Sequence, residues 1–446
     1  SSFFSTYNLT GDNMLENLNK ILWAVAISFI FLNSIYFSFK LKFPQLKIRT
    51  IIKNVFSKNT SSGIKPMDAL MISLGSKIGA GSLAGIAFAI YYGGIGTIFW
   101  MWVSSFFVSV NCFLENILST LYKEKDQEFY KGGPSYYIKN GLNKKKLAYL
   151  YSFLAVLAYI LGFLAIQNNT ITTLVTEIYP VNKILIALLV TLLAGIVILK
   201  GLNIISKICN KIVPIMMISY FIVGLIVIFS NLNSVPAVFL NIIKDAFTPS
   251  AVTGGIIYTF VIGIQKATFI NEAGVGTSAI SSGATSNKDP IKQGYFGIFE
   301  TYFINLFLIT ITAFIIVLSN YESLNLTGIN GIEITKYAFS FHLGHFGEII
   351  LLLILTLFSF STIITVYYYG ESNLKFITNK SKHLKFLKAF SIVILFLGGI
   401  VSASFVWELA DIFIALLAII NIYAIFKLKG RVLAITRDKS YNKNGW

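Results

Sequence analysis

Charged residues are scarce in this sequence, and their scarcity decides the class of protein. Only 12% of the 446 residues are charged, whereas 55% are hydrophobic, and the mean hydropathy is +0.73. A soluble globular protein of this length needs more polar surface than that, so the composition indicates an integral membrane protein.

Cysteine and histidine are also scarce. The two cysteines, Cys112 and Cys209, lie within or beside apolar runs and have no paired spacing, which excludes a disulfide framework. The three histidines, His342, His345 and His383, fall in segments that we expect to be loops. A membrane enzyme would need a nucleophile or a metal cluster at membrane depth, so the sequence predicts neither enzymatic activity nor a cofactor.

Long apolar runs dominate the residues that are present. About 20 apolar residues in a helix cross a hydrocarbon core of about 30 Å. The predicted fold is therefore an all-α polytopic membrane protein with about eleven transmembrane helices. The runs lie near 20–40, 66–91, 94–121, 147–179, 183–200, 204–230, 250–268, 291–318, 347–374, 385–406 and 408–428.

The net charge of +17 follows the loops rather than one surface. Segments 40–65 and 122–146 carry seven Lys or Arg each, whereas segments 1–19, 91–94 and 319–346 are nearly free of them. The positive-inside rule then places the N-terminus outside and the C-terminus in the cytoplasm, as eleven crossings also require. We therefore expect a multi-pass protein of the cell membrane that contacts lipid and does not bind nucleic acid.

Two glycine-rich stretches stand inside apolar runs. Four glycines fall between Gly75 and Gly85, and three more fall within the stretch Thr253–Gly263. Each glycine in a helix interior costs about 1 kcal/mol relative to alanine, so a membrane helix that keeps several has a use for bare backbone. Two interrupted helices in matching halves are typical of the substrate site of a secondary transporter. The alternative is that the glycines only allow close helix packing.

The number of runs divides the chain into two halves. After a leading helix, ten runs form two groups of five, and an odd number per group gives the halves opposite orientations, as in an inverted repeat. The predicted organisation is an extracellular N-terminus, leading helix and basic loop at 1–65, a first repeat at 66–230, a second inverted repeat at 250–428 and a basic cytoplasmic tail at 429–446.

Seven short motifs resemble, in order, those of the alanine or glycine:cation symporter family. The resemblance covers about residues 60–428 and implies a five-plus-five inverted repeat that transports small amino acids with a cation. The motifs are GAGSLAG at 79–85, GIGTIFWMWV at 94–103, GGPSYYI at 132–138, AFTP at 246–249, NEAGVG at 271–276, YYGE at 368–371 and VWELAD at 406–411.

The resemblance also implies a set of binding residues. Backbone groups at the first break are expected to contact the substrate carboxylate, and two hydroxyls with two carbonyls are expected to bind sodium. The implied substrate residues are Gly79, Ala80, Gly81, Ser82, Gln167, Tyr258, Thr259, Phe260 and Val366, and the implied cation residues are Gly75, Ile78, Ser361 and Thr362. Alternatively, Gln167 is an interhelical hydrogen-bonding group, and the two hydroxyls bond to their own preceding turn.

Four positions, 77, 80, 82 and 366, depart from the family pattern. Ala80-Gly81-Ser82 stands where the family usually has Thr-Gly-Asn, Lys77 where it has a small or hydroxyl residue, and Val366 where it has a tryptophan. Val366 suggests room for a side chain larger than methyl.

Lys77 lies near the predicted midplane, where a charged lysine costs about 2.5 to 3.5 kcal/mol unless it is paired or lines water. We hypothesise that its ammonium takes the place of one cation and that Glu300, in another span, is its partner. The alternative is a lysine that extends along a tilted helix toward the membrane surface.

These observations predict a secondary transporter for small neutral amino acids that works by alternating access. Its expected partners are an amino acid, sodium or a proton, and the lipid bilayer. Sodium is the expected coupling ion. One alternative is a proton-coupled or ion-independent carrier in which Lys77 replaces a cation. A further alternative is a transport-inactive sensor or scaffold.

Overall fold

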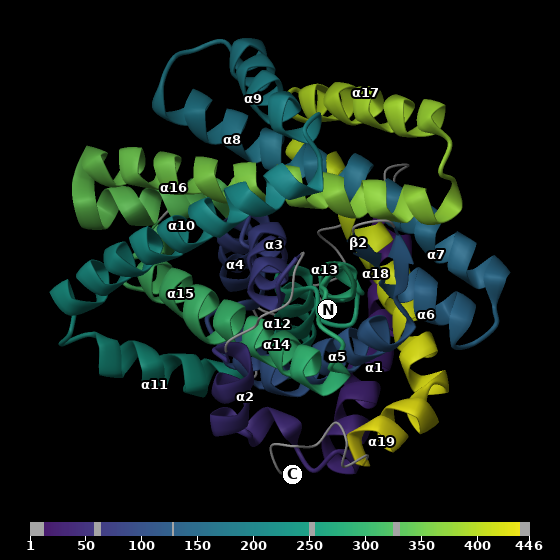
Figure 1. Ribbon diagram of the computed structural model, residues 1–446. Helices are drawn as coiled ribbons and strands as arrows, with labels where there is room; N and C mark the ends of the chain where they lie inside the picture. The colour runs from purple at the N-terminus through teal and green to yellow at the C-terminus, as the bar shows by residue number, and fades with distance from the viewer. Residues whose placement is uncertain (1–12, 58–63, 127–128, 249–254, 324–330, 438–446) are drawn as a thin grey trace.

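The computed structural model describes residues 13–57, 64–126, 129–248, 255–323 and 331–437. Within these residues the chain is a bundle of helices with one small antiparallel hairpin (Figure 1). The elements up to the middle of the chain are α1 (Asn13–Lys40), the 3-10 turn η1 (Pro44–Leu46), α2 (Ile48–Val55), α3 (Pro66–Lys77), α4 (Ala80–Gly93), α5 (Thr97–Tyr122), β1 (Glu124–Asp126), β2 (Phe129–Lys131), α6 (Pro134–Asn140), α7 (Lys145–Leu157), the π-helical turn η2 (Ala158–Phe163), α8 (Leu164–Ile178), α9 (Lys183–Ile198), α10 (Leu202–Ser230) and α11 (Val235–Ala246).

The remaining elements are also helical. They are α12 (Ile256–Asn271), α13 (Thr277–Gly283), α14 (Pro290–Tyr302), the π-helical turn η3 (Phe303–Ile309), α15 (Thr310–Val317), the 3-10 turn η4 (Tyr321–Ser323), α16 (Gly331–Ile377), α17 (Ser381–Gly398), α18 (Ala403–Lys427) and α19 (Lys429–Arg437). Helix α16 is bent at Gly344, where φ is 63°.

The lengths and composition of these helices agree with a polytopic membrane protein. Among the described residues, seven helices are long and apolar enough to cross a membrane, and the bent pair of α3 and α4 makes an eighth span. Helices α9 and α12 are apolar but shorter. The all-α membrane fold is therefore confirmed, whereas the number of eleven crossings and the inverted repeat stay predictions.

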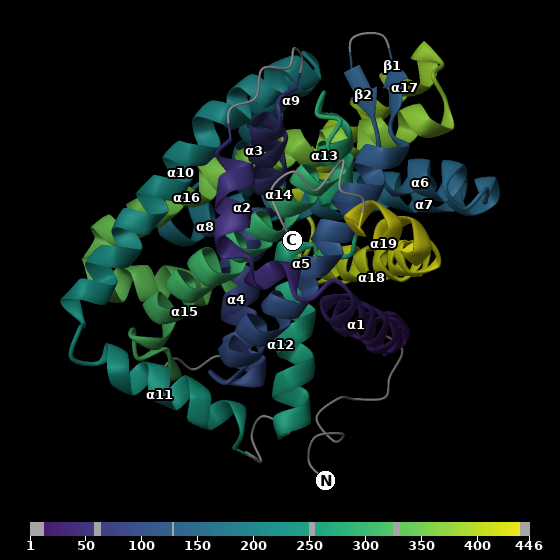
Figure 2. The same ribbon diagram turned by 60° about the horizontal axis from the view of Figure 1, so that its bottom comes forward.

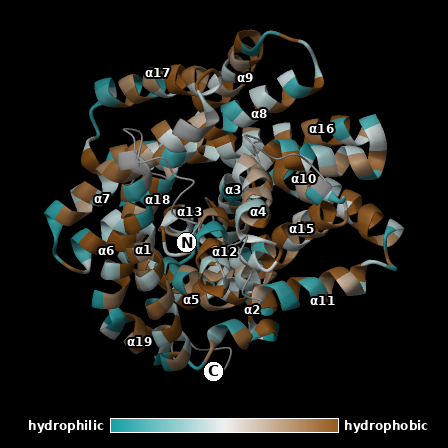
Figure 3. Cartoon of the chain, turned by 180° about the vertical axis from the view of Figure 1, so that it is seen from behind, coloured by the Kyte–Doolittle hydropathy of each residue, from teal (hydrophilic) through white to brown (hydrophobic). Residues whose placement is uncertain are grey.

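The outside of the bundle is hydrophobic, as a lipid-facing surface must be. Exposed leucine and isoleucine side chains follow α9 and α10, with Leu185, Leu192, Ile215 and Ile218 each more than half exposed. Figure 3 shows this hydrophobic colouring along the peripheral helices. Water would penalise such a continuous apolar surface, whereas a bilayer does not.

The interior of the bundle holds the helices that carry the glycine-rich stretches. Helices α3, α4 and α13 lie near its centre, and α12 and α14 run along α5 (Figures 1 and 2). Most residues of α3, α4 and α13 are buried, including several serines. Polar groups at this depth need partners within the protein, and those partners make up the candidate site.

The two glycine-rich stretches have different structural roles. The first contains the predicted break, because α3 ends at Lys77 and α4 begins at Ala80 after a bend of 48°. The second does not contain one in its described part, because α12 is continuous from Ile256 through Gly263. A Cβ on Gly263 would lie 2.7 Å from Trp100 Cβ, so this glycine allows α12 to pack closely on α5.

The second break lies further along the chain, in the segment between α12 and α13. Asn271 is the last residue of α12 and Glu272 follows it, and both side chains are buried. Glu272, Gly274 and Gly276 have positive φ values of 52°, 89° and 103°. Left-handed residues at three alternate positions cannot continue a helix, so α12 ends here.

Lys123 fixes the end of α5 to the loop between α13 and α14. Its ammonium donates to the carbonyl of Thr285 at 2.7 Å and to that of Asn287. Burial, together with the nearby charge of Lys288, lowers the pKa of Lys123 from its usual 10.5 to about 8. The carbonyls favour the charged form, whereas burial and the second lysine oppose it.

Candidate functional site

The break between α3 and α4 exposes the N-terminus of α4 to a polar side chain. The N–H of Ala80 donates to Oε1 of Gln167, on α8, over 2.9 Å. Ser82 turns its hydroxyl back to the Gly79 carbonyl at 2.6 Å. The first N–H groups of a helix carry partial positive charge and favour anions. The amide oxygen of Gln167 therefore occupies a position suited to a carboxylate.

Gly79 fills a gap that admits no side chain. A Cβ at this position would lie 2.5 Å from Thr362 Oγ1 and 2.8 Å from Gln167 Oε1. Its φ of −124° and ψ of −166° are extended values that any residue adopts, so backbone conformation does not require glycine here. Steric crowding between α8 and α16 requires it.

Two hydroxyls of α16 converge on one carbonyl of α3. Ser361 Oγ and Thr362 Oγ1 donate to the Gly75 carbonyl at 3.1 and 2.9 Å. Each has a second acceptor, the Phe358 carbonyl, at 2.8 and 3.0 Å. The hydroxyl protons can therefore turn to Phe358 and leave three oxygens free for a small cation. Ile78, also expected at this site, is buried directly after α3.

Lys77 and Glu300 form a fully buried ion pair. Lys77 Nζ lies 2.5 Å from Glu300 Oε1, and both side chains are at most 3% exposed. Ser73 donates to the same oxygen at 2.6 Å, and Ser278 donates to Oε2 at 2.7 Å. Lys77 also donates to Ser278 over 3.2 Å. The network joins α3, α13 and α14 and satisfies both oxygens of Glu300.

A narrow pocket lies between the two breaks, with room for about one water molecule between its side chains. Its polar wall comes from the first break and Gln167, and its apolar wall from α8, α12 and η2. The ring of Phe269 stacks on those of Phe163 and Trp407, with ring centroids 6.1 and 5.4 Å apart. The lining residues are Ser76, Lys77, Gly79, Gly81, Ser82, Phe163, Ile166, Gln167, Phe269, Ile270 and Glu272.

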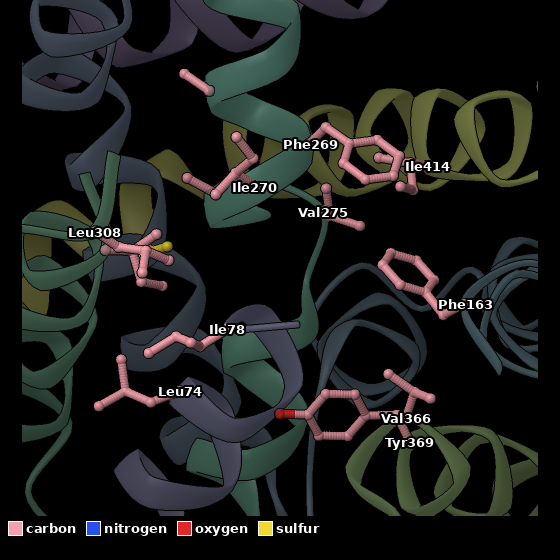
Figure 4. Packing of buried hydrophobic residues seen from close by; sticks show 14 of the residues in the cluster. Leu74, Ile78, Phe163, Phe269, Ile270, Val275, Leu308, Val366, Tyr369 and Ile414 are labelled. Carbon is pink, nitrogen blue, oxygen red and sulfur yellow. The ribbon is translucent and has the colours of Figure 1, made fainter. Parts of the chain in front are cut away.

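The second break closes the other side of this pocket and is held by neighbouring helices. Figure 4 shows the chain leaving α12 near Ile270 and passing Val275 before α13. Tyr151 donates to the Val275 carbonyl at 2.7 Å, and Asn421 donates to the Gly274 carbonyl at 2.9 Å. These bonds, from α7 and α18, satisfy carbonyls that the end of α12 would otherwise leave unpaired.

Five residues expected at the substrate site do not line the pocket, namely Ala80, Tyr258, Thr259, Phe260 and Val366. Thr259 donates to the Gly93 carbonyl at 3.1 Å, and Phe260 packs against Trp100 at 5.0 Å. With Tyr258 they lie on α12 well before the second break, because that break is at Glu272 rather than in the glycine-rich stretch. Val366 is fully buried in α16, so its small size does not enlarge this pocket.

Six lining residues of the pocket were not predicted from the sequence: four apolar residues, one acid and Ser76. Phe163 and Ile166 precede Gln167 by four and one residues, so helical periodicity from Gln167 indicates at least Phe163. Phe269, Ile270 and Glu272 belong to the true second break, and the motif NEAGVG was the signal for it. Its two glycines allow the positive φ values.

Comparison with known proteins identifies the family. The profile of the sodium:alanine symporter family matches residues 8–445. The chain belongs to the sodium:alanine symporter family. It is 34% identical to the probable sodium/glutamine symporter GlnT of Bacillus subtilis (strain 168), over 97% of this chain and 91% of that protein.

Two further relatives of this sodium:alanine symporter family member have nearly full coverage. The putative sodium/proton-dependent alanine carrier protein YrbD of Bacillus subtilis (strain 168) is 30% identical over 97% of this chain and 93% of its own length. The sodium/alanine symporter AgcS of Methanococcus maripaludis is 29% identical over 97% of both chains. The protein is therefore a multi-pass membrane transporter that couples amino-acid movement to a cation, and it is not an enzyme.

Proposed function

We propose that the protein is a secondary active transporter that carries small neutral amino acids with sodium by alternating access. The observation that carries the proposal is the pocket between two helix breaks, with the N-terminus of α4 on one side and the C-terminus of α12 on the other. A zwitterion needs both a positive and a negative environment within a few ångströms. We further propose that it resides in the cell membrane with its N-terminus outside and its C-terminus in the cytoplasm.

The substrate carboxylate binds at the N-terminus of α4. In the structure, Gln167 Oε1 accepts from the N–H of Ala80 at 2.9 Å and stands where a carboxylate oxygen would bind. The pocket is too narrow for an amino acid in this state, so Gln167 and Phe269 must move apart when substrate enters. This opening and reclosing is the local part of alternating access.

The substrate side chain is small and uncharged. Phe163, Ile166, Phe269 and Ile270 line the space beyond the polar wall, and the ammonium of Lys77 is already neutralised by Glu300. An acidic substrate side chain would be buried there without a counter-charge, which is costly. Alanine and glycine fit best, and glutamine is a useful test because the relative GlnT is a probable sodium/glutamine symporter.

Sodium binds between Gly75 and the hydroxyls of Ser361 and Thr362. This site offers neutral oxygen ligands, which suit a hard monovalent cation. It lies beside Gly79, which is next to the side chains of both Thr362 and Gln167. A cation here would pull on the same backbone segment that contacts the substrate.

Lys77 replaces a second cation, which is the alternative that the buried ion pair favours. Its ammonium sits 2.5 Å from Glu300 at the end of α3, where a mobile cation would otherwise be needed to neutralise this acid. Replacing Lys77 with Met should then change the ion dependence or the pH profile of uptake. If uptake, ion dependence and pH profile were all unaltered, Lys77 would have only a structural role.

The deciding experiment is uptake by the purified protein in liposomes. Labelled alanine, glycine, glutamine, leucine and methionine are compared under inward gradients of sodium, lithium and choline, with empty liposomes as the control. We expect sodium-driven accumulation of alanine or glycine, with weaker competition by leucine and methionine. Binding of substrate without accumulation under any gradient would instead favour a sensor that kept the fold.

A further inference from the structure

Glu272 is a buried acid for which the network around Lys77 provides no partner. It is 2% exposed, stands at the second break and lines the pocket. Among the described residues its Oε2 atom has no well-formed hydrogen bond, and the neighbouring polar group is the hydroxyl of the buried Thr277. An uncompensated carboxylate in an apolar interior costs several kcal/mol, so it must take up a proton or a cation.

The charges around Glu272 do not balance without such a ligand. The described cation that faces it is Lys77, whose ammonium is in contact with Glu300 at 2.5 Å. One positive charge therefore faces two carboxylates. The titratable groups that face Glu272 are Lys77 from α3, Glu300 from α14, Tyr151 from α7, Tyr159 from η2 and Tyr369 from α16.

The ligand set at the second break suits a proton better than a metal cation. Asn271 Oδ1 accepts from the N–H of Ala273 at 2.8 Å, and the amide nitrogen of Asn271, a donor, has no partner within the described part of the chain. The Tyr151 hydroxyl is engaged with the Val275 carbonyl. A hard metal cation needs several convergent oxygens, whereas a proton needs one.

We propose that Glu272 is a proton-binding site of the transport cycle, so that the carrier moves a proton together with its amino acid. This inference rests on the proposed transport function. A proton from one side of the membrane forms an O–H bond with the Glu272 carboxylate, and the bond breaks when the pocket opens to the other side. No electrons are transferred. The neutral acid also removes a negative charge that repels the substrate carboxylate, so proton binding favours substrate binding.

The test uses the full-length protein in liposomes that contain a pH-sensitive dye. For the wild type, we expect alanine entry to carry protons inward, and an imposed pH gradient without a sodium gradient to drive accumulation. The E272Q variant mimics the protonated acid. Whatever the rate of its exchange of labelled for unlabelled alanine, that rate should no longer depend on pH. Its proton influx and its accumulation under the pH gradient should fall at least tenfold.

The matched control is E115Q. Glu115 is also fully buried, and its Oε1 likewise has no hydrogen-bond partner among the described residues, but its Oε2 accepts from Asn421 at 2.8 Å and it does not line the pocket. This variant should keep the proton influx of the wild type. Equal loss of proton influx in E115Q and E272Q would contradict the assignment to Glu272.

Three other results would overturn the inference. The first is an E272Q variant that still accumulates alanine under the pH gradient. The second is a folded E272Q variant that no longer exchanges alanine, because the carboxylate would then be a substrate ligand. The third is a wild type that transports alanine without protons, which leaves the proposed transport function intact. If E272Q does not fold, E272D replaces it, and an unchanged pH profile of its uptake would contradict the proposal.

Discussion

Replacing Gly79 with alanine is the sharpest test of the first break. The new Cβ would lie 2.5 Å from Thr362 Oγ1 and 2.8 Å from Gln167 Oε1, whereas ordinary contact begins at 3.4 Å. The two side chains must therefore retreat by about 0.6 to 0.9 Å, or the backbone must move away from them. Either response disturbs the candidate cation site and the candidate carboxylate site together.

The expected cost can be estimated from the contacts. Overpacking a buried position costs roughly 1 to 3 kcal/mol, and a buried N–H of Ala80 left without Gln167 costs roughly 1 to 3 kcal/mol more. The lower limits of the two costs add to about 2 kcal/mol. Half of that, about 1 kcal/mol, already changes an affinity about fivefold. We expect G79A to raise the concentrations of both sodium and alanine that give half-maximal uptake by about tenfold, and to lower thermal stability.

Uptake into liposomes and thermal unfolding in detergent measure these effects. The matched control is G85A in the same helix, because a Cβ on Gly85 would lie 3.7 Å from the Ile270 side chain, an ordinary contact. G85A should keep the wild-type affinities and gain up to about 1 kcal/mol of helix stability. A G79A variant with wild-type affinities for both solutes would refute the steric reasoning.

Three further predictions concern the cation site, the ion pair and pH. T362V removes one hydroxyl from the Gly75 carbonyl and should raise the sodium concentration for half-maximal uptake about tenfold. T365V is the control, because Thr365 donates to the carbonyl of Ser361 in its own helix. K77M leaves Glu300 buried without its counter-charge and should lower the free energy of unfolding by roughly 3 to 5 kcal/mol. The double variant K77M/E300Q should recover most of that stability. Equal destabilisation of the single and double variants would contradict the role of the buried charge. Lys123 has a pKa of about 8 in the folded protein against an ordinary 10.5, so the folded state binds fewer protons between these values, and stability should rise with pH from 7 to 10. Thermal unfolding of K123M should show a smaller rise than the wild type, and an identical pH dependence would count against the lowered pKa.

The two glycine-rich stretches of the sequence mark two different structural features, a helix break and a close helix contact. Gly79 lies in the break between α3 and α4, where its neighbours in space are polar side chains of α8 and α16. Gly263 marks close packing of α12 on α5. Both stretches look alike in the sequence, because only the partner helix decides whether bare backbone binds a ligand or another helix. The resemblance to the family located the motif NEAGVG at 271–276. It did not show that a helix ends inside this motif, because Asn, Glu and Gly also occur at ordinary helix ends in loops.

The candidate site was predictable where its chemistry is unusual in a membrane. A lysine and a glutamate at membrane depth have few partners, so Lys77 and Glu300 could be matched although 222 residues separate them, and they lie in contact. Apolar lining residues such as Phe163 and Phe269 carry no such signal, because most residues of the chain are apolar. Only the fold distinguishes a phenylalanine that faces the pocket from one that faces lipid.

The arrangement of the first break gives a short physical route for coupling. Within six consecutive residues, Gly75 offers a carbonyl to the candidate cation site, Lys77 holds Glu300, and the N–H of Ala80 contacts Gln167. A cation that drew the Gly75 carbonyl toward α16 would therefore displace the backbone at the candidate carboxylate site. Because Lys77 also donates to Ser278 in α13, the same displacement reaches the second break. Coupling through one rigid segment requires no distant pathway, since both sites bias the position of the same few backbone groups.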